Sequence, residues 1–181
     1  MNIPQVTNGH RANIIGKLED SLTSLEQSLK RVSPDKWPAK PQPEAWSVGE
    51  VVHHLVLVEV QRLQQIKDIL EGRAESAPAR DGPAPRIETA RSRKKKFKTG
   101  TKMEPTPGLP AKVLLGAIHR ARKETLDFVQ AADLDRLSQI WLNTISLGPL
   151  NGVEYFEFLA VHMERHVEQI EEIASEVAQS S

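Results

Sequence analysis

The sequence FLAVHMERHVEQI, residues 158–170, predicts an amphipathic helix that carries two histidines on one face. Its apolar side chains recur every three or four residues and continue a pattern that begins after Asn151. His162 and His166 are four residues apart, so both imidazoles lie on one side of the helix, at the edge of the apolar stripe, and can bind one divalent metal together. The predicted inward residues of this helix are Phe156, Leu159, Ala160, Met163, Val167, Ile170 and Ala174.

Three further segments show the helical period, and no segment alternates convincingly with a period of two. The first ends before Ser33, and the second opens with a capping box formed by Ser47 and Glu50. The third begins near Pro110. We therefore predict an all-α protein with four helices. The predicted inward residues of the first three helices are Ile14, Leu18, Leu22, Leu25, Leu29 and Val32, then Val48, Val51, Val52, Leu55, Leu63, Ile66 and Leu70, then Val113, Leu114, Ala117, Ile118, Ala121, Thr125 and Phe128.

The length of 181 residues fits a single domain, residues 1–181, because domains usually run to about 100–200 residues. The 24 basic residues balance 24 acidic ones, so no net charge draws the whole chain to nucleic acid or to a membrane. The chain has no cysteine, which leaves imidazole and carboxylate as the strong metal ligands. Residues 1–20 contain no signal-peptide block, and no run of about 18 apolar residues could span a bilayer. We expect a cytoplasmic protein.

Residues 72–110 form a long basic, proline-rich connection between the second and third helices. Six of the twelve prolines lie there, with ten Lys or Arg against four Asp or Glu. A crossover of this length is predicted to be mostly loop and lets the two helices run parallel. The most basic run, Arg91 to Lys98, is interpreted as a solvated loop, with a phosphate or nucleic-acid contact or a lid over an anionic substrate as alternatives. Phe97 alone interrupts the run, which is too few aromatics for base stacking.

His54 is the best candidate for a third metal ligand. At roughly 100° per residue, it lies closer to the apolar stripe of the second helix than its neighbour His53 does. His10 and His119 have no other histidine nearby in sequence and are predicted to be surface residues. The metalloprotease motif H-E-x-x-H is absent, because Met163 follows the first histidine where that motif has its glutamate. Peptide hydrolysis is therefore disfavoured.

Two parts of the chain resemble the DinB/YfiT-like superfamily. Residues 46–55, WSVGEVVHHL, with Glu59 after them, are similar to the W-S-x-x-E-x-x-x-H-L segment of that superfamily. Residues 147–150, LGPL, followed by residues 158–170, are similar to its ending, L-G-x-L … H-x-x-x-H-x-x-Q-I. The resemblance covers nearly the whole chain in order and spacing.

The resemblance implies a four-helix bundle of up-down-down-up course that is often a homodimer. It also implies a divalent metal, zinc or nickel, held by His54, His162 and His166. Gln169 matches the family's glutamine and would orient an imidazole. The chain departs from the pattern at residues 143–146, NTIS, where relatives often carry His-Pro, so any role of that upstream histidine is absent.

Characterised members of the superfamily include bacillithiol S-transferases and a mycothiol-dependent isomerase. The resemblance thus implies a metal-dependent transferase or related enzyme that activates a low-molecular-weight thiol or water against a small-molecule substrate. The alternative is a non-catalytic, stress-related metal- or small-ligand-binding protein, and a third interpretation is nucleic-acid binding through the basic run. An enzyme should leave the metal open to a pocket with polar groups such as Glu59 or Gln169, whereas a structural metal would have a fourth protein ligand.

Overall fold

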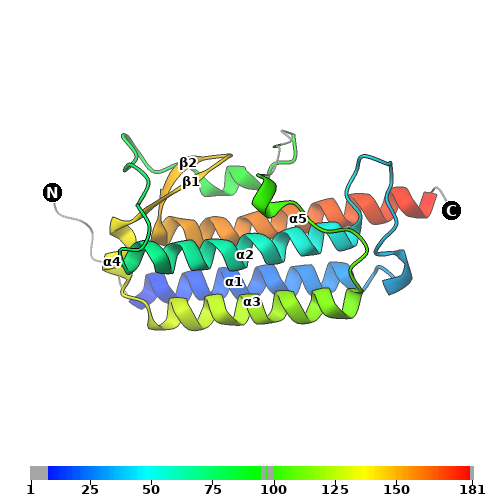
Figure 1. Ribbon diagram of the computed structural model, residues 1–181, viewed down its shortest axis with the longest axis horizontal. Helices are drawn as coiled ribbons and strands as arrows, with labels where there is room; N and C mark the ends of the chain where they lie inside the picture. The colour runs from blue at the N-terminus through cyan, green and yellow to red at the C-terminus, as the bar shows by residue number, and fades with distance from the viewer. Residues whose placement is uncertain (1–7, 95–96, 98–99, 180–181) are drawn as a thin grey trace.

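Four long helices make up most of the protein. The computed structural model describes residues 8–94, 97 and 100–179. The four long helices pack side by side, as Figure 1 shows. These helices are α1 (Asn8–Leu29), α2 (Val48–Leu70), α3 (Ala111–Ala131) and α5 (Gly152–Gln179). The prediction of a mostly helical four-helix protein is therefore confirmed.

The helices form two parallel pairs that run in opposite directions. Lys17 in α1 lies 3.2 Å from Glu157 near the start of α5, and Arg31, just after α1, lies 3.4 Å from Glu171 farther along α5. Contacts at both ends in the same order mean that α1 and α5 are parallel. In Figure 1, α2 and α3 run together in the opposite direction, which places α2 antiparallel to α5.

The second helix begins where its capping box predicts. The Ser47 hydroxyl accepts from the backbone N–H of Glu50 at 3.2 Å, and the Glu50 carboxylate accepts from the backbone N–H of Ser47 at 2.8 Å. Two amides that would lack an intrahelical partner are thereby satisfied. This local arrangement sets the start of α2, two turns before His54.

Short 3-10 helices interrupt the connections. One, η1 (Pro34–Lys36), lies between α1 and α2, while η2 (Ile87–Arg91) and η3 (Thr101–Met103) lie in the crossover that joins α2 to α3. The η2 segment packs against α5, and η3 packs against α2. The crossover therefore lies over the two helices that carry the candidate histidines. Three lysines of the basic run, Lys95, Lys96 and Lys98, fall outside the described residues.

The purely helical prediction is wrong for the segment that connects α3 to α5. It contains the short helix α4 (Leu134–Gln139) and an antiparallel hairpin of β1 (Trp141–Thr144) and β2 (Gly148–Asn151). Leu142 and Leu150 are paired across the two strands and are fully buried. Strands of four residues are too short to reveal a period of two, so the pattern missed them.

Gly152 allows the hairpin to join α5 directly. A Cβ atom at this position would lie 2.7 Å from the carbonyl oxygen of Leu137 in α4, which is closer than real Cβ contacts. The preceding Asn151 caps the helix, because its side-chain oxygen accepts from the backbone N–H groups of Val153 and Glu154 at 3.0 Å each. These contacts hold the start of α5, and hence its histidines, against α4 and the hairpin.

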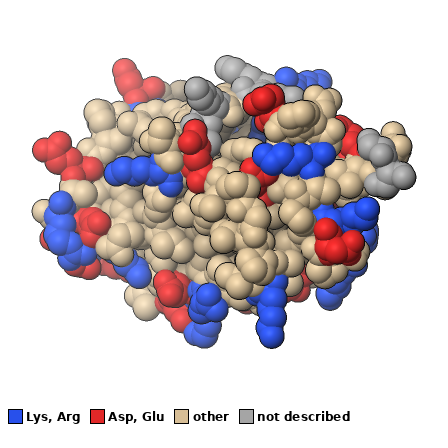
Figure 2. All heavy atoms as spheres, turned by 45° about the vertical axis from the view of Figure 1, so that its right-hand side comes forward, with Lys and Arg blue, Asp and Glu red and all other residues tan. Residues whose placement is uncertain are grey.

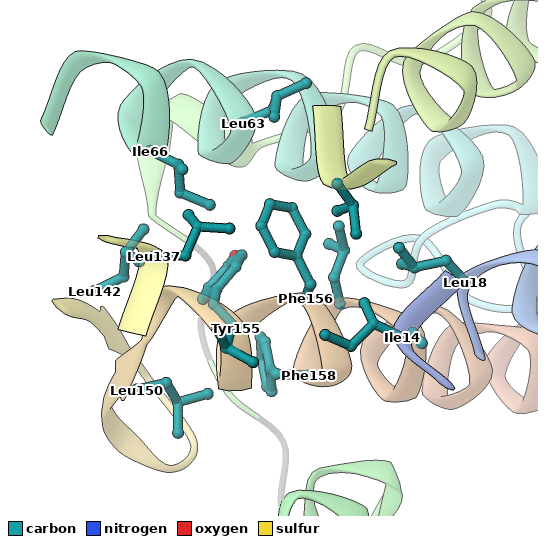
Figure 3. Close-up of a cluster of buried hydrophobic side chains, with 14 of the residues drawn as sticks. Ile14, Leu18, Leu63, Ile66, Leu137, Leu142, Leu150, Tyr155, Phe156 and Phe158 are labelled. Carbon is teal, nitrogen blue, oxygen red and sulfur yellow. The ribbon is translucent and has the colours of Figure 1, made fainter. Parts of the chain in front are cut away.

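One end of the bundle is filled by a cluster that includes the hairpin. Side chains of α1, α2, α4, α5 and both strands converge there, as Figure 3 shows, and the labelled members are Ile14, Leu18, Leu63, Ile66, Leu137, Leu142, Leu150, Tyr155, Phe156 and Phe158. Val113 was predicted to face inward, but 54% of it is exposed. It occupies the first turn of α3, where no neighbouring element of the described structure covers it, so the helical period alone misplaced it.

A buried ion pair crosses the middle of the bundle. Arg122 in α3 donates two hydrogen bonds to Glu59 in α2, at 2.6 and 3.0 Å, and a third to the Ser21 hydroxyl in α1 at 2.9 Å. Arg122 and Glu59 are 0% and 1% exposed, so each buried charge is neutralised by the other.

None of the described helices is long and apolar enough to cross a membrane.

Candidate metal centre

Three histidines from two antiparallel helices meet at one point. His54 comes from α2, and His162 and His166 lie one turn apart on α5. Each offers a ring nitrogen, and these three nitrogens all lie within 4.8 Å of one another. The structure thus brings together the three residues that the family resemblance assigns to a metal. We call this group the histidine triad.

Two members of the triad are oriented by hydrogen bonds at the ring nitrogen that faces away from the other triad members. Nδ1 of His54 lies 2.8 Å from the carbonyl oxygen of Met103, and Nδ1 of His166 lies 2.8 Å from Oε1 of Gln169. Both partners are acceptors, so Nδ1 of each ring carries the proton and donates. Nε2 of each ring is then left with its lone pair free. Partners of this kind commonly fix the tautomer of metal-binding histidines.

The spacing of the two imidazoles on α5 suits a shared divalent ion. Nε2 of His162 lies 3.2 Å from Nε2 of His166. Two nitrogens about 2.0–2.1 Å from one tetrahedral ion are roughly 3.3 Å apart, so the observed separation fits two donors to one ion. The other ring nitrogen of His162, Nδ1, is buried without a hydrogen-bond partner among the described residues.

Burial lowers the pKa of all three histidines. It lowers the pKa of His162 to about 3, and nearby His54, Arg165 and Arg62 act in the same direction. The pKa of His166 is well below its usual value, because the ring is buried beside His162 and His54. Burial is also the main reason that the pKa of His54 is lowered. The three imidazoles are therefore neutral near pH 7, which is the form that binds metal.

The other histidines lie away from the triad. His53 is half-buried, and its Nδ1 accepts from the backbone N–H of Thr106 at 2.8 Å. The side chains of His10 and His119 are 41% and 51% exposed, as predicted. Glu59 was expected among the polar groups around the metal, but it lies in the bundle core and is held by Arg122. The buried cation draws this carboxylate away from the site.

The triad borders an open cleft of about 1460 Å³. One face of α2 and one face of α5 form its sides, and part of the crossover lies along it. Among the residues that the structure describes, no fourth histidine, aspartate or glutamate joins the triad. A metal held by three protein ligands beside a cleft has a coordination position for a small molecule, which is typical of catalytic sites.

Sequence reasoning missed three groups that shape this cleft. The Met103 carbonyl orients His54 from the crossover, 49 residues away in sequence. Arg62 and Tyr155 line the cleft beyond the triad. Both could have been found by extending the helical face of each histidine by two turns, from His54 to Arg62 and from His162 back to Tyr155. The Met103 carbonyl has no sequence signal, because any residue carries one.

Two arginines of the basic run form ion pairs with α5. Arg91 lies 3.3 Å from Glu164 and 2.7 Å from Glu168, and Arg93 lies 2.8 Å from Glu172, all on α5. Basic and acidic side chains are also interspersed on the face seen in Figure 2. These two arginines attach the crossover to α5. Their charges are therefore used in ion pairs within the protein and not in phosphate binding.

Comparisons with known proteins agree with this arrangement. A model of the DinB superfamily matches residues 17–170. The uncharacterized protein YuaE of Bacillus subtilis (strain 168) is 25% identical over 153 residues, which are 82% of this chain and 90% of YuaE. The structure of YfiT from Bacillus subtilis, described as "a probable metal-dependent hydrolase with an unusual four-helix bundle topology", is similar in fold. Its TM-score is 0.61 at 14% identity, over 97% of this chain and 91% of YfiT. Since the family match spans most of the sequence and includes all three histidines, the chain belongs to the DinB superfamily.

Proposed function

We propose that this protein is a divalent-metal-dependent enzyme that activates a low-molecular-weight thiol for attack on a small electrophile. The observation that carries the proposal is the histidine triad, with its three ring nitrogens within 4.8 Å at the side of an open cleft. A bound divalent ion would supply Lewis acidity, which lowers the pKa of a coordinated thiol and maintains it as the thiolate. Zinc and nickel both suit three imidazole ligands.

The surroundings of the triad support a role in binding and orientation. Met103 and Gln169 hold two of the imidazoles through Nδ1. Aromatic rings lie beside two of them, because Trp46 is 5.0 Å from His54 and Phe158 is 5.7 Å from His162 between ring centroids. These rings shield part of the site from water, which strengthens electrostatic interactions inside it.

The response of each nucleophile to metal coordination favours a thiol over water. A metal-bound water has a pKa of about 7, so it is only partly ionised at neutral pH, whereas a coordinated thiol is deprotonated outright. Glu59, the carboxylate expected beside the metal, is bound by the buried Arg122 and is not available as a general base for water.

The proposal can be tested with cobalt(II) as a spectroscopic substitute for the native metal. Protein loaded with one equivalent should develop a thiolate-to-cobalt charge-transfer band when titrated with 2-mercaptoethanol, cysteine or glutathione. Ethylene glycol, which replaces the thiol by a hydroxyl, is the matched control ligand and should give no such band. Thiol consumption in the presence of 1-chloro-2,4-dinitrobenzene then measures turnover.

Three results would point elsewhere. A protein that holds cobalt but develops no band with any thiol contradicts the proposal. Thiol binding without turnover of any electrophile supports the non-catalytic small-ligand-binding alternative. Metal-dependent ester hydrolysis without thiol binding would favour water as the nucleophile, the chemistry suggested by the description of YfiT.

A further inference from the structure

A second group of polar side chains lies along the cleft, beyond the triad. Arg62 in α2 is half-buried and lines the cleft, and its Nη1 donates to Oε1 of Gln65 at 2.7 Å. Within the described ranges, no carboxylate forms an ion pair with Arg62. Arg93, which also lines the cleft, is by contrast paired with Glu172. Arg62 therefore presents a positive charge to the cleft with most of its donors unused.

The Tyr155 side chain lies across the cleft from Arg62. The residue is only 2% exposed, yet it lines the cleft, and no described residue is hydrogen bonded to its hydroxyl. The charge of Arg62 acts on this hydroxyl, although burial is the stronger influence and raises the pKa of Tyr155 to about 12. The hydroxyl thus remains protonated and is available as a donor at the cleft.

Both residues are displaced from the triad in the same direction. Arg62 follows His54 by eight residues and Tyr155 precedes His162 by seven, which is about 10–12 Å along the helix axes. Because α2 and α5 run antiparallel, these two displacements lead to the same part of the cleft.

We propose that Arg62 and the Tyr155 hydroxyl form an anion-binding subsite. This subsite binds a carboxylate at one end of the ligand, while the other end of the same ligand reaches the histidine triad. This inference rests on the proposed function and narrows its substrate class to thiols that carry a carboxylate several bonds from the sulfur. A single planar guanidinium with one added hydroxyl donor matches a carboxylate, which is planar and singly charged. A doubly charged phosphate monoester would need further cations beside Arg62.

The test uses three ligands of one chain length with zinc-loaded protein. The ligand 6-mercaptohexanoate carries both groups, 6-mercaptohexanol carries only the thiol, and hexanoate carries only the carboxylate. Binding is followed by protein NMR, which reports association without any turnover. We expect the dissociation constant of 6-mercaptohexanoate to be lower than that of 6-mercaptohexanol by a factor of about ten or more. One charge-assisted hydrogen bond contributes a difference of this size.

Variants assign that difference to the subsite. Arg62→Gln should abolish the preference for 6-mercaptohexanoate over 6-mercaptohexanol while leaving the affinity for 6-mercaptohexanol unchanged. Arg62→Lys should retain part of it, and Tyr155→Phe should reduce it. Arg120→Gln removes the same charge from an exposed position on α3 and should preserve the full preference.

The outcomes separate this inference from the proposed function. Equal binding of the two thiols by the unmodified protein, or a carboxylate preference that survives in Arg62→Gln, overturns the subsite even if thiol activation is correct. Arg62-dependent binding of hexanoate with no binding of 6-mercaptohexanol supports the subsite and contradicts thiol activation. No carboxylate binding by either hexanoate or 6-mercaptohexanoate also overturns the subsite.

Discussion

The main-chain carbonyl oxygen of Met103 lies 2.8 Å from Nδ1 of His54, although 49 residues separate the two in sequence. The crossover thereby orients one of three candidate metal ligands. The crossover is also attached to α5, the helix of the other two ligands, since Arg91 and Arg93 pair with acidic residues of that helix. The path of the long connection and the geometry of the triad are consequently linked.

Removal of one triad member should abolish metal binding. His54→Ala or His162→Ala leaves only two imidazoles, and we expect the metal content after dialysis to fall from about one equivalent per chain to below about a tenth, since structural and catalytic zinc sites use at least three protein ligands. Elemental analysis measures this content. His53→Ala is the matched control, because His53 neighbours His54 but contacts Thr106 instead, and it should retain the metal. Full metal content in His54→Ala would exclude the triad as the site.

Gln169 should contribute to metal affinity without touching the metal. Gln169→Ala removes the acceptor that holds Nδ1 of His166, and we expect metal affinity to fall by about 10–100-fold. Competition with a chromogenic chelator measures the dissociation constant. Gln130→Ala, at an exposed position of α3, is the control and should leave affinity unchanged. An unchanged affinity in Gln169→Ala would show that the His166 tautomer is set by something else.

The buried pair of Glu59 and Arg122 should be needed as a pair. Arg122→Met leaves the Glu59 carboxylate buried without its cation, and we expect a loss of about 3–5 kcal/mol in the free energy of unfolding. Urea denaturation measures the loss. The double variant Glu59→Leu with Arg122→Met should recover most of the stability, because it removes both charges together. A double variant as unstable as the single one would show that packing, rather than charge, accounts for the loss.

Glu50 should make stability depend on pH in the acid range. Burial acts to raise the pKa of Glu50, but hydrogen bonds from Ser47 and Lys40 outweigh it, so the folded-state pKa is below the ordinary value. The unfolded chain therefore takes up this proton first, and the stability that Glu50 provides is present above about pH 4.3 and is lost as the pH falls below that value. Urea titrations between pH 3 and 6 measure the effect.

A substitution isolates the contribution of Glu50. Glu50→Gln cannot ionise but still suits the capping box, so its free energy of unfolding should change less between pH 6 and pH 3 than that of the unmodified protein. Glu19→Gln, at an exposed position of α1, controls for the loss of one carboxylate. An identical pH dependence in the unmodified protein and in Glu50→Gln would contradict the assignment.

Local patterns in the sequence were sufficient for the long helices. The start of α2 follows from Ser47 and Glu50, which satisfy each other's amides within one turn. The shared face of His162 and His166 follows from a spacing of four in any α-helix. These features depend on residues close together in the chain, so their geometry can be calculated before the fold is known.

Contacts between distant residues required the tertiary structure. The hairpin is stabilised by burial of Leu142 and Leu150 in a core supplied by other elements, which a four-residue strand does not reveal. The ion pair of Glu59 and Arg122 likewise depends on the packing of α2 against α3. Because of this pair, Glu59 lies in the bundle core instead of beside the metal site, where it was expected.

The three candidate metal ligands show the same difference between local sequence patterns and long-range contacts. Helical geometry determined that His162 and His166 share a face, and helical phase together with the family resemblance indicated His54 as the third ligand. Only the antiparallel packing of α2 and α5 brought the three rings within 4.8 Å and placed Arg62 and Tyr155 farther along one cleft. The physical reason is that helix formation is governed by neighbours in sequence, whereas a ligand set drawn from two helices is decided by burial and by where the chain crosses over.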